Sequence, residues 1–145
     1  MKPEDKVASD VREHGWHVIL VAASDSTPEF AYTVGFTATF GHPEIAVFGL
    51  PSAKAHTLLN EAGSAIRNGS VFGAGVRNRE LLVGYDVTFI AFPRGEYPRY
   101  LGFARQYYAG DDFAALQLVW PDPNGRFPWD AGVAEHARKI QAVAP

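Results

Sequence analysis

The sequence contains no cysteine. A chain without thiols has no disulfide framework, no thiolate nucleophile and no iron–sulfur cluster, and it suits a reducing compartment. It also lacks an apolar run long enough to cross a bilayer, and its opening segment MKPEDKVASDVREHG carries charges where a signal peptide needs an apolar stretch. We therefore expect a cytoplasmic protein with no membrane partner.

An excess of positive charge is also missing. Lys and Arg number 13 against 16 Asp and Glu, which gives a net charge of −3. This balance provides no basic surface for a nucleic-acid backbone, so nucleic acid is not an expected partner. The five histidines show neither H-x-x-x-H nor H-x-H spacing, and no metal site is predicted. Hydrolytic signatures are absent too, because no G-x-S-x-G elbow or glycosidase-type carboxylate pair stands out.

The residues that are present fit one globular domain. The chain has 145 residues, 47% of them hydrophobic and 13% aromatic, enough for a single aromatic-rich core. We expect one domain over residues 1–145. Hydrophobic patterns punctuated by Gly and Pro predict helices near 4–14, 52–69 and 98–110 and from about 132, and strands at 16–23, 30–36, 44–50, 81–92 and 114–120.

The order of these elements predicts an α+β fold with a mostly antiparallel sheet, open or barrel-like, and flanking helices. The segment 16–23 is apolar on both faces, which favours a central strand. The segment 30–36 alternates between bulky residues and small or hydroxyl residues. Its small-residue face is a candidate surface for a ligand.

The segment TATFGHPE, residues 37–44, holds the first candidate ligand-binding residues: Thr37, Thr39, Gly41 and His42. Hydroxyls and glycine N–H groups suit a phosphate or carboxylate. The alternative is structural, with a β-branched strand entering a glycine turn and the imidazole capping backbone groups. The sequence alone supports both the ligand-binding and the structural interpretation of this segment.

Two further segments supply candidates. Arg105 lies beside two tyrosines on a predicted helix, where it would neutralise an aromatic anion. Asp122, Arg126 and Trp129 lie in a turn-rich loop that we expect to complete a pocket with TATFGHPE. In the alternative interpretation, the acid and the arginine bridge their own loop and the tryptophan covers a core edge.

Several ordered blocks of the sequence resemble the bacterial family named domain of unknown function 4262. They are GW at 15–16, AYTVGF at 31–36, GHPE at 41–44, GFARQYYAG at 102–110, LQLVWPD at 116–122 and GRFPW at 125–129. That resemblance brings no activity with it. The early strands are also similar to split-barrel flavin reductases, a resemblance that implies small and hydroxyl residues around a flavin phosphate.

Together these observations predict a small domain that binds an anionic aromatic ligand, either a flavin such as FMN or another nucleotide. A redox step is the enzymatic form of that hypothesis. The alternative is a non-catalytic protein-interaction or regulatory module, in which the aromatic loops form an interface. Purified protein that is yellow or retains a nucleotide would favour the first.

Overall fold

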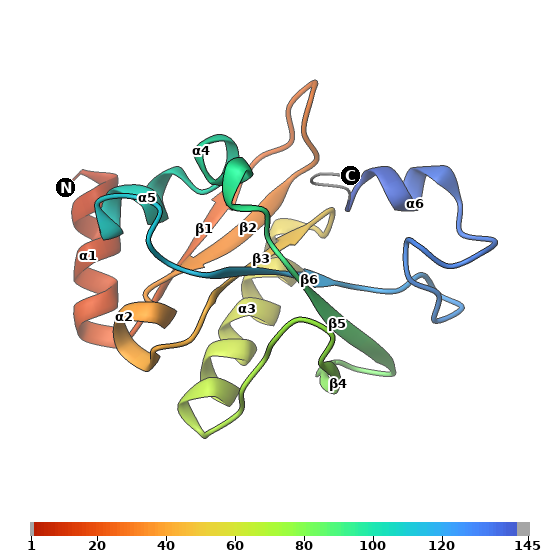
Figure 1. Ribbon diagram of the computed structural model, residues 1–145, viewed down its shortest axis with the longest axis horizontal. Coiled ribbons are helices and arrows are strands. Elements are labelled where there is room, and N and C mark those ends of the chain that lie inside the picture. Colours follow the sequence, from red (N-terminus) through yellow and green to blue (C-terminus); the bar gives the residue numbers. More distant parts are fainter. Residues whose placement is uncertain (1, 142–145) are drawn as a thin grey trace.

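The computed structural model describes residues 2–141, which contain one six-stranded sheet (Figure 1). The strands lie in the order β1-β2-β3-β6-β5-β4. Neighbouring strands are antiparallel except β3 and β6, which run parallel. The bounds are β1 (His17–Val21), β2 (Phe30–Val34), β3 (Glu44–Phe48), β4 (Arg77–Leu82), β5 (Tyr85–Ala91) and β6 (Ala115–Val119). The α+β class and the placement of all five predicted strand segments in one sheet are confirmed.

Helices cover both faces of this sheet (Figure 1). Their bounds are α1 (Pro3–His14), α2 (Phe36–Phe40), α3 (Ser52–Arg67), α4 (Tyr97–Tyr100), α5 (Gly102–Tyr108) and α6 (Glu135–Lys139). The buried stripe of α3 packs on one face, and α1, α4 and α5 supply the core on the other. Each face therefore has its own hydrophobic cluster.

The small-residue face of β2 is closed, contrary to our expectation. Ala31 packs in the α3 cluster, whereas Phe30 and Tyr32 pack in the opposite one. Thr33, on the same face as Ala31, is fully buried. A strand covered by helices on both sides has no face left for a ligand.

The first strand of the chain, β1, also lies at a different position in the sheet from the one predicted. β1 is an edge strand rather than a central one. Its two faces are apolar because Val18 packs in the α3 cluster and Ile19 in the opposite cluster, so helices rather than neighbouring strands cover it. The sheet is open, with β1 and β4 as its edges, and the barrel-like form is wrong.

Two predicted elements are divided. The segment 81–92 is not one strand: β4 and β5 form a hairpin that turns at Gly84, whose φ of +83° only glycine adopts readily. The predicted helix at 98–110 is two helices, α4 and α5, with Leu101 between them at φ −110°. Both breaks occur where local backbone geometry overrides a continuous apolar pattern.

Candidate functional site

The TATFGHPE segment forms the short helix α2 and a glycine turn. The Thr37 hydroxyl donates to the backbone oxygen of His42 at 2.9 Å, and the Thr39 hydroxyl donates to that of Gly15 at 2.6 Å. Gly41 ends the helix in the left-handed conformation, at φ +66°. The hydroxyls predicted to meet a ligand therefore fix the backbone of this turn.

Both ring nitrogens of His42 are occupied by backbone groups. Its side chain is buried at 6% exposure. The Phe72 backbone N–H donates to Nε2 at 2.9 Å, and Nδ1 lies 2.8 Å from the Pro43 carbonyl oxygen. A carbonyl only accepts and an N–H only donates, so the ring carries its proton on Nδ1 and is neutral. Both nitrogens cap backbone groups, as in our structural alternative.

Glu44 is not among the predicted site residues, yet it has the densest set of hydrogen bonds in this segment. Its carboxylate, only 1% exposed, accepts hydrogen bonds from the backbone N–H groups of Gly35, Phe36 and Thr37, each at 3.1 Å. The hydroxyls of Thr33 and Tyr108 also donate to it. Burial raises the pKa of the Glu44 carboxyl, and these hydrogen bonds oppose the rise.

The loop carrying Asp122, Arg126 and Trp129 does not meet this turn. TATFGHPE precedes β3 and the loop follows β6, and because these two strands are parallel the segments lie at opposite ends of the sheet (Figure 1). Asp122 accepts from Arg126 Nε at 3.1 Å, and Trp129 stacks on Phe127. The predicted shared pocket does not form.

Arg105 is also held within its own segment. Its Nε donates to Asp111 Oδ1 at 2.6 Å, which ties the end of α5 to the loop before β6. Both side chains are about one-third exposed. The structure therefore divides the predicted site residues among three separate places.

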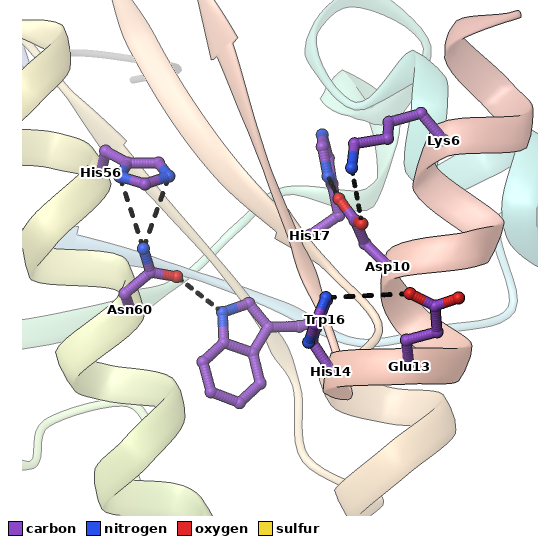
Figure 2. Close-up of polar contacts among 8 residues, drawn as sticks. All are labelled: Lys6, Asp10, Glu13, His14, Trp16, His17, His56 and Asn60. Atoms are coloured by element: carbon purple, nitrogen blue, oxygen red, sulfur yellow. Dashed lines mark hydrogen bonds and ion pairs between the residues drawn. The ribbon is translucent and has the colours of Figure 1, made fainter. Parts of the chain in front are cut away.

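A different set of residues lines an open cleft of about 620 Å³. Figure 2 shows residues of α1 and the start of β1 facing residues of α3. The lining residues are Asp10, Glu13, His14, Trp16, His17, Val18, His56, Asn60 and Arg67. Pockets for small molecules usually measure about 300–1,000 Å³, so this cleft has the size of a ligand site.

One wall of the cleft carries a fixed carboxylate–imidazole pair. His17 Nδ1 lies 2.6 Å from Asp10 Oδ2, and Lys6 Nζ donates to Asp10 Oδ1 at 3.0 Å (Figure 2). Burial acts to raise the pKa of the Asp10 carboxyl, but hydrogen bonds from His17 and Lys6 outweigh it and the pKa is lowered. Because Asp10 is an acceptor, His17 carries a proton on Nδ1, and in the neutral ring Nε2 is the free base.

The floor of the cleft is the closely packed Trp16 ring. The Trp16 indole N–H donates to Asn60 Oδ1 at 2.8 Å, and the ring packs so closely on Gly63 that an added Cβ would lie 2.5 Å from it. The Arg67 guanidinium lies 4.9 Å from the Trp16 ring centroid and donates to the His14 backbone oxygen at 2.7 Å. A cation is thereby held at one end of the cleft.

Two more imidazoles and one carboxylate complete the lining. Asn60 Nδ2 lies 3.4 Å from both ring nitrogens of His56, and His14 Nε2 lies 3.9 Å from Glu13 Oε2 (Figure 2). Within residues 2–141 no group of three or more acidic or histidine side chains is arranged to hold a metal ion. The imidazoles, the carboxylates and Arg67 can take part in acid–base chemistry and can bind an anion.

No motif in the sequence points to this cleft. Its residues come from a helix, the strand after it, and a helix about 40 positions later, with no motif that joins them. His14 and His17 lie three apart, but one ends α1 and the other begins β1. The turn at Gly15 between them, with φ +101°, brings the end of α1 beside the strand.

The protein is therefore an α+β domain with an open sheet, helices on both faces of that sheet and a histidine-lined cleft at the β1 edge. The chain belongs to the family described as Domain of unknown function (DUF4262), whose model matches residues 10–134. Comparisons with curated proteins and with solved structures gave no match. No helix within residues 2–141 has the length and apolar character required to span a bilayer.

Proposed function

We propose that this protein binds a small anionic ligand in the cleft between α1, β1 and α3. The observation that carries the proposal is the Arg67 guanidinium, held between the Trp16 ring and the His14 carbonyl at the end of a cleft lined by three imidazoles. A guanidinium has five N–H donors, so donors remain for a phosphate or carboxylate.

The carboxylates of the cleft leave room for an anion. The charge of Asp10 is offset by Lys6, and its second oxygen is occupied by His17 Nδ1. Glu13 is exposed and lies beside His14, so its charge is screened by solvent. An anion approaching Arg67 therefore meets a cation that no acidic residue of the described chain neutralises by an ion pair within the cleft.

The phosphate of a flavin or a nucleotide fits this description, which moves our ligand hypothesis from the TATFGHPE turn to the cleft. FMN and AMP are the first probes, with inorganic phosphate as the minimal one. Reduction of bound FMN by a nicotinamide cofactor would support the redox form of the hypothesis. The interaction-module alternative requires instead a stable complex with another protein and no small-molecule binding.

Isothermal titration calorimetry with the three probes tests the proposal. We expect Arg67→Gln to weaken binding about ten- to a hundredfold, the usual effect of losing a charge-assisted hydrogen bond. Arg99→Gln is the matched control, because Arg99 stacks on Tyr100 at 5.1 Å in the same way but lies outside the cleft. Absence of binding at millimolar concentration, or equal loss in both variants, would reject the proposal.

A further inference from the structure

The pair formed by His17 and Asp10 has an arrangement that anion binding alone does not require. Both oxygens of Asp10 are used, one by Lys6 and one by His17, so the carboxylate cannot rotate without losing a contact. The carboxylate in turn fixes the imidazole ring and its tautomer. His17 is 23% exposed and Asp10 14%, so the pair is sheltered but reaches the cleft.

We propose that His17 is a general base that activates water against a phosphate ester bound in the cleft. This inference rests on the proposed function, since Arg67 is assigned the phosphate. Asp10 is a positioning residue: it holds the proton on Nδ1 and leaves Nε2 to accept one. A base held this way is the usual partner of an attacking water or hydroxyl.

The step balances without any other reactant. His17 Nε2 takes a proton from water while the water oxygen forms a bond to phosphorus. The bond from phosphorus to the ester oxygen breaks, and the departing oxygen receives the proton through solvent, which returns His17 to its neutral form. Arg67 offsets the charge that builds on the phosphoryl oxygens. The products are an alcohol and a phosphate.

The other imidazoles are weaker candidates for the base. His14 is about 70% exposed and its neighbour Glu13 is 3.9 Å away. Among the described residues, the hydrogen-bond partner of the His56 ring is the Asn60 amide, 3.4 Å from each ring nitrogen, a geometry that fixes no tautomer. His17 alone among the cleft imidazoles has a short bond to a carboxylate that is itself anchored.

The test measures turnover of p-nitrophenyl phosphate and bis(p-nitrophenyl) phosphate by the full chain. We expect His17→Gln to lower kcat at least about a hundredfold, the lower end of general-base contributions. Asp10→Asn should lower kcat by at least about tenfold with little change in KM, because an amide permits the wrong imidazole tautomer. His136→Gln, on α6 and outside the cleft, should leave turnover unchanged.

Melting curves and titration of each variant with inorganic phosphate, which the reaction does not consume, show whether the cleft is intact. A wild-type protein that turns over neither ester faster than His17→Gln overturns the inference, and so does an Asp10→Asn variant that binds phosphate normally and keeps the wild-type kcat. If phosphate binding persists in either case, the proposed function stands and only the catalytic step fails. If no probe binds, the proposed function fails first.

Discussion

Glu44 fixes the junction between β2, α2, β3 and α5. Each of its oxygens accepts at least two hydrogen bonds, and three of the donors are backbone N–H groups that cannot turn into acceptors. In Glu44→Gln the amide NH₂ faces such donors, and the variant should lose about 2–5 kcal/mol of unfolding free energy, because buried donors are left unpaired.

Urea unfolding measures this loss, with the exposed Glu80→Gln on β4 as the control for a change of charge. A loss below about 1 kcal/mol, the range of surface substitutions, would contradict the structural role assigned to the Glu44 carboxylate.

Tyr32 gives stability a dependence on high pH. Burial raises the pKa of its phenol to about 12, although the Phe103 backbone N–H donates to the hydroxyl oxygen and partly opposes this. Between about pH 10, the ordinary value, and pH 12 the unfolded chain releases this proton while the folded chain keeps it. Stability is therefore full below pH 10 and falls as the pH rises, by up to about 1.4 kcal/mol per pH unit.

Chemical unfolding between pH 9 and 11.5 checks this slope. Burial also raises the pKa of Tyr97 and of Tyr108, which add to it. Tyr32→Phe should make the unfolding free energy fall less steeply with pH, by the contribution of the Tyr32 proton, and should leave the contributions of the other tyrosines unchanged. An unchanged slope in Tyr32→Phe would show that this phenol does not contribute.

Individual side chains differ in how well their roles could be predicted from the sequence. Thr37, Thr39 and His42 were given both a ligand-binding and a structural interpretation, and their hydrogen bonds follow the structural one. Asp10 and His17 were not predicted as site residues, because they lie on different elements, α1 and β1, and come into contact only through the turn between them. Residue types are visible in a sequence, but partners from different elements are not.

At the scale of elements, the contact between α3 and Trp16 sets the shape of the cleft. Gly63 lies inside α3, where alanine would ordinarily favour the helix by about 1 kcal/mol. The added Cβ would lie 2.5 Å from the indole ring, so we expect Gly63→Ala to destabilise the protein by about 1–3 kcal/mol instead. The sign of the change separates packing from helix propensity.

Thermal unfolding followed by tryptophan fluorescence measures this change. Ser64→Ala is the matched control, because Ser64 is the next residue of α3 and is exposed. If Gly63→Ala proved as stable as Ser64→Ala or more so, the close contact between the glycine and Trp16 would be wrong.

Elements with a single strong signal were predicted well from the sequence. The buried stripe of α3 and the strand β6 match the apolar patterns. The segment 81–92 was read as one strand because leucine, valine and phenylalanine continue through the turn, with only Gly84 to mark the reversal. The position of a strand within the sheet was harder to predict, because β1 is apolar on both faces and yet lies at the edge.

At the scale of the whole molecule, one sheet joins all six strands, with a helical layer on each face. We therefore expect the chain to unfold as one cooperative unit, as single domains of this size usually do. Tryptophan fluorescence and far-UV circular dichroism should give coincident urea transitions. Two separated transitions would instead divide the chain into independent units.

The parallel pairing of β3 with β6 at the centre of the sheet determines which loops lie at the same end of the sheet. Because β3 and β6 run the same way, the turn before one and the loop after the other lie at opposite ends of the sheet. The sequence predicts a mostly antiparallel sheet, and only an antiparallel pairing of β3 with β6 would have brought the two segments together. The direction of β6 relative to β3 thus excludes a pocket shared by the TATFGHPE turn and the loop after β6.

Mapping a ligand onto the chain by NMR tests the central claim most directly. Amide shifts of ¹⁵N-labelled protein would be followed during titration with AMP, then repeated with Arg67→Gln. We predict saturable shifts at Asp10, Trp16, His17 and Asn60, which weaken strongly in the variant. Shifts centred on Thr39 and His42 or on Asp122 and Trp129, or no saturable shifts at all, would contradict the assignment of the cleft as the binding site.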